Sequence, residues 1–136
     1  MTLQELNRYF DLNDKLAKAN EMLERLQAAI LPGGQVLTGM PHAPGVKDKV
    51  GDLAVEIVDL EARITYLKSE IKKQEDEISV FVATIEDDYT RMIFRLRFQR
   101  ALLWEDVTAI IGGGNTVESV KSTCYRYLEK LQRDAP

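Results

Sequence analysis

The stretch Asp88–Leu131, DYTRMIFRLRFQRALLWEDVTAIIGGGNTVESVKSTCYRYLEKL, decides the fold that this sequence predicts. Apolar residues recur in it at helical spacing, which predicts one helix over Tyr89–Gln99 and another over Trp104–Ile111. Glycines at 112–114 interrupt the pattern and predict a turn, because glycine adopts backbone conformations that other residues avoid. We expect Thr116 to be the N-cap of a last helix. The predicted core positions are Met92, Ile93, Phe94, Leu96, Phe98, Val107, Ile110, Ile111, Val117, Val120, Cys124, Leu128 and Leu131.

Basic side chains are concentrated in the same part of the chain, although the whole protein has a formal net charge of −4. Residues 1–88 hold 10 basic and 17 acidic residues, a balance of −7, whereas residues 89–136 hold 8 and 5, a balance of +3. Asp87 and Asp88 are suited to cap the first short helix, since carboxylates are favoured at the positive end of the helix dipole. We expect at least one of the arginines between residues 91 and 100 to pair with Asp87, Asp88 or Glu105.

Two longer helices are predicted before this stretch. The first covers Leu3–Ile30, and the second runs from about Val50–Asp52 to about Ile85. Each keeps apolar residues at alternating steps of three and four, which is the seam pattern of a coiled coil. A loop over residues 31–49, rich in proline and glycine, is expected to connect them.

The predicted fold class is all-α. A long antiparallel coiled-coil hairpin over residues 1–86 precedes a three-helix, helix-turn-helix domain over residues 87–136. A two-helix hairpin buries only one side of each helix, so we expect a homodimer or a higher oligomer through the coiled coil. Gln74 is a lone polar residue in the seam, of the kind that can fix register or oligomeric state.

Several classes of protein are not indicated by the composition. Cys124 is the only cysteine and His42 the only histidine, so no zinc site, catalytic triad or other catalytic constellation is expected. We interpret Cys124 as a buried structural thiol. No apolar run approaches the ~20 residues of a membrane span, and the first residues lack a signal-peptide pattern. We therefore expect a cytoplasmic protein without a cofactor that is not an enzyme.

The same stretch resembles a known family. RMIFRLRFQRALLWEDVTAIIG, followed by SVKSTCYRYLEKL, is similar to region 4 of bacterial sigma factors. Together with GMPHAPGVKDKVGDLAVEIVDLEARI, it looks like the small phage-encoded, sigma-70 region-4-like transcriptional regulators of the ArpU/RinA type. In that family a coiled-coil hairpin precedes the sigma-like module, so the resemblance implies binding of double-stranded DNA by the last helix.

Three positions depart from that resemblance. Leu103 stands where the family has a capping Ser or Thr, and Thr108 stands where it has a small alanine. The turn over residues 112–114 is about two residues longer than in sigma factors. Base contacts therefore cannot be transferred position by position.

The residues expected to contact DNA follow from how a recognition helix enters the major groove, with its first turns at the base edges. Arginine is favoured for guanine because its fork is bidentate. The candidates for base contact are Glu118, Ser119, Ser122, Thr123 and Arg126. Those for phosphate contact are Thr116, Lys121, Tyr125, Arg126 and Lys130, with Arg95, Arg97 and Arg100 on the preceding helix. The alternative is a solvated face, with Tyr125 and Tyr127 packed on the hairpin. We interpret Trp104 as a half-buried residue at the edge of the core.

The expected function is sequence-specific DNA-binding transcriptional regulation, of a phage or prophage late-gene type. Double-stranded DNA is the expected partner, and RNA polymerase is a second candidate partner. One alternative is a phage DNA-packaging protein like a small terminase subunit, which also joins a helix-turn-helix to coiled-coil oligomerisation. The other is a protein-interaction adaptor that does not touch DNA, an alternative that the overall acidity supports.

Overall fold

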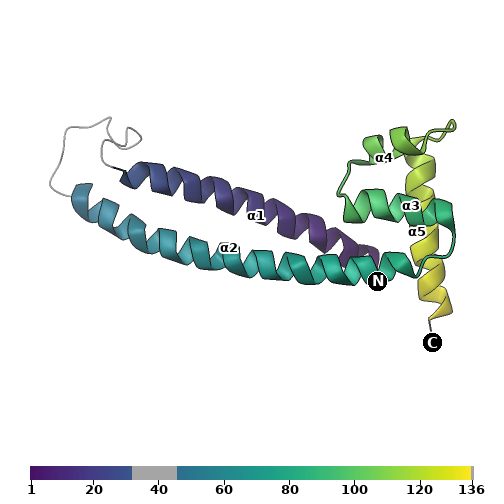
Figure 1. Cartoon of the computed structure of the whole chain (residues 1–136), viewed down its shortest axis with the longest axis horizontal. Coiled ribbons are helices and arrows are strands. Elements are labelled where there is room, and N and C mark those ends of the chain that lie inside the picture. Colours follow the sequence, from purple (N-terminus) through teal and green to yellow (C-terminus); the bar gives the residue numbers. More distant parts are fainter. Residues whose placement is uncertain (32–45, 136) are drawn as a thin grey trace. The chain divides into compact units, whose positions relative to one another are not determined.

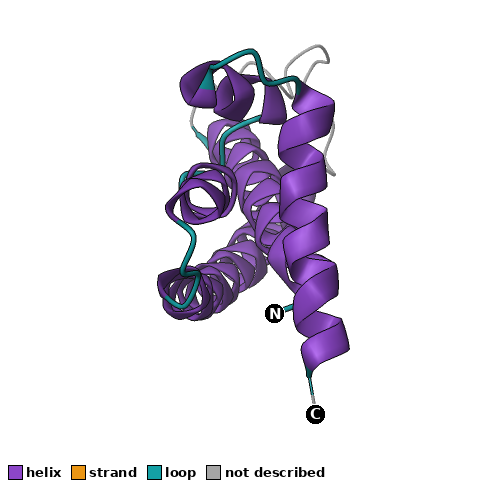
Figure 2. Ribbon diagram, turned by 90° about the vertical axis from the view of Figure 1, so that its right-hand side faces the viewer, coloured by secondary structure: helices purple, strands orange, loops and turns teal. Residues whose placement is uncertain are grey.

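The computed structural model describes residues 1–31 and 46–135, and every regular element in these ranges is a helix (Figures 1 and 2). The all-helical class is therefore confirmed for the described residues. Most of the predicted 31–49 loop, including His42, lies outside them. The elements are α1 (Leu3–Ile30), α2 (Val46–Ala83), α3 (Asp88–Phe94), a π-helical segment η2 (Arg95–Gln99), α4 (Trp104–Ile111) and α5 (Val117–Asp134).

The start of the second long helix was predicted too late. α2 begins at Val46, whereas the apolar repeat placed its start near Val50–Asp52. Val46 and Val50 continue the steps of four and three back from Leu53, and Gly51, a residue type that is unfavourable inside a helix, does not interrupt α2. At the other end, the Thr84 and Ile85 amides donate to the carbonyls of Phe81 and Val82, which closes α2 with tight turns.

The chain divides into two compact units. One contains Met1–Asp11 together with Ile71–Pro136, and the other contains Leu12–Glu70. The predicted division between residues 86 and 87, which separates the coiled-coil hairpin from the helix-turn-helix domain, stays a prediction. The first turns of α1 therefore pack in the same unit as the C-terminal helices.

The unit Leu12–Glu70 consists of the remainder of α1 alongside the first part of α2. A shallow hollow in this unit is lined by residues of both helices, among them Met22 and Leu26 of α1 and Leu60 and Arg63 of α2. The two helices therefore lie side by side in this unit. Burial follows the predicted repeat, with these seam residues less than a tenth exposed: Leu12, Ala19, Ile57, Ile64 and Leu67.

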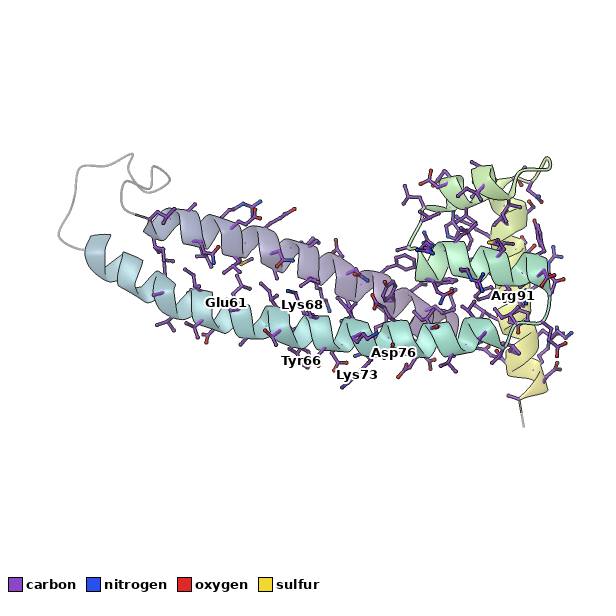
Figure 3. The ribbon with its side chains drawn as sticks, in the orientation of Figure 1. Glu61, Tyr66, Lys68, Lys73, Asp76 and Arg91 are labelled. Carbon is purple, nitrogen blue, oxygen red and sulfur yellow. The ribbon has the colours of Figure 1, made fainter. Side chains whose placement is uncertain are left out.

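The second helix also has an exposed apolar stripe, which the sequence analysis missed. Val55 and Val58 are 60% and 65% exposed, and Tyr66 is 49% exposed. With Ala62 they follow one another at steps of three and four, which places them on the side of α2 away from the buried seam. Tyr66 is labelled in Figure 3. This face of α2 has no cover from the described part of the chain.

In the other unit, the first turns of α1 pack against the last turns of α2. The Tyr9 hydroxyl donates to Glu75 Oε1 at 3.2 Å. Gln74 is only 8% exposed, and its Oε1 atom has no hydrogen-bond partner among the described residues. A buried polar atom without a partner costs about 1–3 kcal/mol, so Gln74 lowers the stability of this packing.

Replacing Gln74 by leucine is expected to raise the free energy of unfolding by about 1 kcal/mol, because the unpaired oxygen is removed at similar volume. Urea unfolding followed by circular dichroism measures the change. Glu77→Leu is the matched control at an exposed position of the same helix and should change stability by less than ~0.5 kcal/mol. A loss of stability in Gln74→Leu would show that the carboxamide has a partner in the native assembly.

Aromatic side chains form a small core among the C-terminal helices, whose ribbons are drawn in Figure 1. Phe94 contacts Phe81, Phe98 and Tyr127, with ring centroids 5.8, 5.6 and 5.5 Å apart. The other fully buried side chains of this core are Ile93, Val107, Val120 and Cys124. Most predicted core positions of this part are buried or half-buried.

Met92 and Ile110 are exceptions, 41% and 59% exposed. Ile93, Phe94 and Phe98 occupy one face of α3 and η2, which leaves Met92 on the opposite face. The π-helical turn at Arg95–Gln99 adds a residue to the helical repeat, which an analysis based on 3.6 residues per turn cannot detect.

Candidate nucleic-acid interface

The candidate interface begins with α4, which spans Trp104–Ile111 as predicted. It starts without a side-chain cap, because Leu103 has no hydrogen-bonding group to offer the first amides. Glu105 and Asp106 in its first turn partly compensate by placing negative charge at the positive end of the helix. The helix is fixed to the core through Val107, which is fully buried.

The turn after α4 depends on its glycines. Gly112, Gly113 and Gly114 have φ angles of +64°, +65° and +77°, a region that side-chain-bearing residues rarely adopt. A Cβ at Gly113 or Gly114 would meet no close atom, so backbone conformation and not space requires glycine there. Asn115 Nδ2 donates to the Gly112 carbonyl oxygen at 2.8 Å and holds the turn together.

The start of α5 is fixed by a reciprocal cap. The Ser119 amide donates to Thr116 Oγ1 at 3.1 Å, and the Thr116 amide donates to Ser119 Oγ at 2.9 Å. The prediction of Thr116 as N-cap is confirmed. Both hydroxyl oxygens accept hydrogen bonds from backbone amides in this cap. Thr116 and Ser119 therefore have less hydrogen-bonding capacity left for a ligand.

The inner face of α5 is apolar and carries the single cysteine. Val120 and Cys124 are fully buried and Leu128 nearly so, in agreement with the predicted core. Burial raises the pKa of the Cys124 thiol to about 12, so the thiol stays protonated at neutral pH. The interpretation of Cys124 as a buried structural thiol is confirmed.

The opposite face of α5 forms an outward stripe, defined by Ser119, Ser122, Arg126, Glu129 and Arg133 at alternating steps of three and four. Arg126 is exposed and forms no ion pair with the described residues. Glu118 is also exposed, beside Ser119 at the start of the helix. Arg126 is therefore a guanidinium that is free to bind a ligand.

The other predicted contact residues lie on the two flanks of this stripe. Lys121 is half-buried and Tyr125 is beside it, with its ring 6.2 Å from that of Trp104. On the other flank, the Thr123 hydroxyl donates to the Ser119 carbonyl oxygen at 3.0 Å, and Lys130 is exposed. The predicted set consequently does not share one face of α5.

Two aromatic residues that were interpreted as packing groups do pack. Tyr127 contacts Phe81 and Phe94, with centroids 6.5 and 5.5 Å apart. Trp104 is half-buried and contacts Phe98 at 6.4 Å. Both therefore belong to the core edge.

The arginines of α3 and η2 differ in their surroundings. Arg91, labelled in Figure 3, donates to the carbonyl oxygens of Ile85 and Glu86 at 2.8 and 3.3 Å. It also pairs with Asp88, so the expected arginine–aspartate pair is confirmed. Its partner Asp88 begins α3, which Asp87 caps by accepting from the Thr90 amide. The Arg91 guanidinium is therefore held at the start of α3 by these bonds and is not free to bind a ligand.

Arg95 and Arg100 are exposed and pair with no acidic side chain of the described residues. With Gln99 they line one open hollow of about 430 Å³. Arg97, in contrast, is half-buried and stacks on aromatic rings inside the fold. Arg95 and Arg100 therefore offer two free guanidinium groups at one place, whereas Arg97 does not.

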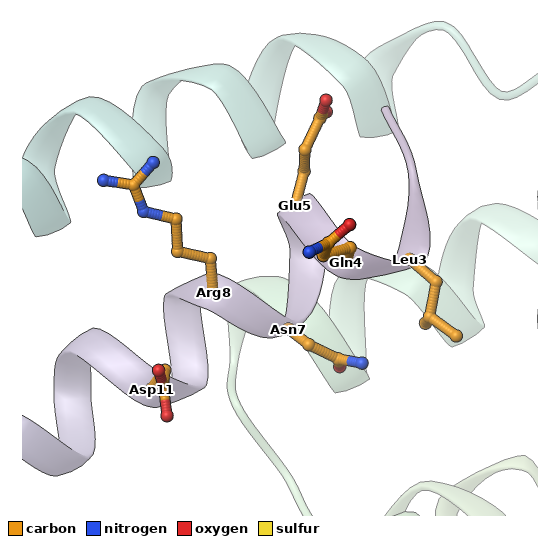
Figure 4. A pocket seen from close by; sticks show the side chains of 6 residues that line it. All are labelled: Leu3, Gln4, Glu5, Asn7, Arg8 and Asp11. Atoms are coloured by element: carbon orange, nitrogen blue, oxygen red, sulfur yellow. The ribbon is translucent and has the colours of Figure 1, made fainter.

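Another hollow, of about 720 Å³, lies beside the first turns of α1 (Figure 4). Its lining residues, Leu3, Gln4, Glu5, Asn7, Arg8 and Asp11, all come from one helix. No second element brings a polar group toward them in that lining, so the hollow is open surface and not a built site. Among the described residues, no group of His, Cys, Asp and Glu side chains is placed to hold a metal ion.

Comparisons with known proteins add no relative. No protein-family model, curated protein or solved structure matches the chain. Within the described ranges, no helix is both long enough and apolar enough to cross a membrane.

Proposed function

We propose that the protein is a sequence-specific, DNA-binding transcriptional regulator of a phage or prophage late-gene type. In this proposal α4, the glycine turn and α5 act as a sigma region-4-like helix-turn-helix, with α5 as the reading helix. The observation that carries it is the outward stripe of α5. Arg126, a free arginine, lies on this stripe about two and a half turns after the start of α5, where Thr116 and Ser119 form the cap.

Direct readout requires this combination of fixed backbone and free donor. A reading helix must enter the major groove with its register set by the protein, and its exposed side chains must still be available for base edges. Arg126 meets both conditions, and Ser122, which is half-buried, lies one turn before it on the same stripe. Glu118 at the first turn can accept from a cytosine amino group, although it also repels phosphate.

Phosphate contacts are assigned to the cations that are free. These are Arg95 and Arg100 at their shared hollow, and Lys130 on the flank of α5. The balance of +3 over residues 89–136 favours an anionic partner for this part of the chain. Lys121 and Tyr125 belong to the proposed surface only at its edge, and Arg97 is left out because it is held by aromatic rings.

A second copy of the chain is part of the proposal. The long helices are taken as an antiparallel coiled-coil hairpin that oligomerises, and the exposed stripe of Val55, Val58 and Tyr66 supports this, because apolar residues at helical spacing favour packing against another helix. Two weakly charged domains held together bind a two-part site far more tightly than one.

The test is selection of duplexes from a random library by the full-length protein, with the mass of the free and bound protein measured by light scattering. A regulator of the proposed kind enriches one sequence and binds it as a dimer or another small oligomer. Rings of eight or more subunits would favour a packaging protein. Failure to enrich or bind any duplex would contradict the proposal and leave the adaptor alternative.

A further inference from the structure

Arg97 lies between two aromatic rings from distant parts of the chain. Its guanidinium carbon is 4.4 Å from the ring centroid of Phe10 in α1 and 4.8 Å from that of Trp104 in α4. Nη1 donates to the Leu102 carbonyl oxygen at 2.8 Å. Phe10, Arg97 and Trp104 all belong to the unit formed by Met1–Asp11 and Ile71–Pro136.

The surroundings of this guanidinium contain no ion-pair partner among the described residues. Nε of Arg97 is buried without a hydrogen-bond partner in the described structure, and burial lowers the pKa of the group. A half-buried cation is usually paired with a carboxylate, whereas here the faces of two rings provide the compensating attraction. Arg97 is thus bound to Phe10 and Trp104 and not to an acid.

The stack also reaches the reading helix. Trp104 is the first residue of α4, and its ring contacts Phe98 at 6.4 Å and Tyr125 of α5 at 6.2 Å. Phe10 contacts Phe98 at 5.9 Å on the other side. The start of α4 has no side-chain cap. The contacts of the Trp104 ring therefore hold this end of the helix in place of a cap.

We propose that Arg97 is a positioning residue for DNA recognition, which holds the start of α4 against the first turns of α1 and does not contact DNA itself. The first turns of α1 then contribute to DNA recognition by supporting the helix-turn-helix formed by α4 and α5. This inference rests on the proposed function. It assigns to Phe10, which is 94 positions before Trp104 in the sequence, an effect on DNA affinity through Arg97.

The experiment compares full-length variants that remain folded by circular dichroism, using the selected duplex. Trp104 is the only tryptophan, so its fluorescence reports the environment of α4 directly. Phe10→Leu, Arg97→Gln and Arg97→Lys are each expected to shift the Trp104 emission and to weaken DNA binding by about 3- to 30-fold. The dependence of affinity on salt should keep the wild-type slope, since no phosphate contact is lost.

Arg100→Gln is the matched control, because it removes a free guanidinium from the same segment. It is expected to reduce the salt slope by about 0.9 and to leave the Trp104 emission unchanged. The inference would be overturned if Arg97→Gln reduced the salt slope of DNA affinity while Arg97→Lys and Phe10→Leu bound DNA as the wild type does. That result would indicate that Arg97 contacts a phosphate. Lower melting temperatures with unchanged DNA affinity would also overturn it, since Arg97 would then stabilise the fold alone.

The two proposals fail in distinguishable ways. If the wild-type protein binds no duplex, both the proposed function and the positioning role are wrong. If the wild type binds its selected duplex but Phe10→Leu leaves the Trp104 emission and the affinity unchanged, only the positioning role is wrong.

Discussion

Replacing Phe98 by alanine is expected to lower the free energy of unfolding by about 3–5 kcal/mol, the usual cost of removing a fully buried aromatic ring. Phe98 is 1% exposed and contacts the rings of Phe10, Phe94 and Trp104. Its removal opens a cavity among these rings, where α1, η2 and α4 meet. Urea unfolding of the full-length protein, followed by circular dichroism and by Trp104 fluorescence, measures the loss.

Tyr89→Ala is the control for this change. Tyr89 is an aromatic residue of α3, but it is 40% exposed and its removal leaves the ring cluster intact. We expect a change of less than ~1 kcal/mol. Equal losses in the two variants would contradict the placement of Phe98 at the centre of the core.

Arg126→Ala is expected to weaken binding to the selected duplex by about 10- to 100-fold, the range of a bidentate arginine–guanine contact. The reason is that Arg126 is the free guanidinium nearer to the start of α5 on its outward stripe, opposite Val120 and Cys124. Binding to unselected duplexes should fall much less, so the variant loses specificity. Fluorescence anisotropy with both duplexes at fixed salt measures the two affinities.

Arg133→Ala removes the same charge from the same stripe, two turns further from the start of α5. It should weaken binding by less than about 3-fold and equally for both duplexes, because only a non-specific charge is lost. If Arg126→Ala and Arg133→Ala behaved alike, the assignment of α5 as a base-reading helix would be wrong.

Much of the C-terminal fold was predictable from the sequence, because its signals are local. The bounds of α4 follow from a glycine stop and an apolar repeat, and Thr116 was identifiable as a cap from its residue type and position. Val82, fully buried beside the predicted seam of α2, was not identified. The last turns of α2, which include Val82, belong to the same compact unit as α3–α5. No local sequence pattern indicates that arrangement.

The candidate site was less predictable, because equal residue types acquire different roles through tertiary contacts. The sequence presents Arg91, Arg95, Arg97 and Arg100 as one basic group. In the structure, Arg91 donates to a backbone carbonyl oxygen just before α3, and Arg97 stacks on the rings of Phe10 and Trp104. Arg95 and Arg100 line an open hollow and remain free. The contact with Phe10 could not be inferred, since it joins residues separated by most of the chain.

The separation of Lys121 from Arg126 was accessible from helical geometry alone. Residues five positions apart on an α-helix point in different directions, and the core face at Val120 and Cys124 places Lys121 next to buried residues. Helical geometry therefore places Lys121 at the edge of the proposed surface.

The most direct test of the account is the ratio of affinities for the selected duplex and for a scrambled duplex of the same composition, measured with the full-length protein at one salt concentration. A sequence-specific regulator should give a ratio of about 10³ or more, as for other specific DNA-binding proteins. We also expect Arg126→Ala to reduce this ratio. Equal affinities for the two duplexes, or no binding to either, would contradict the claim that α5 reads DNA sequence.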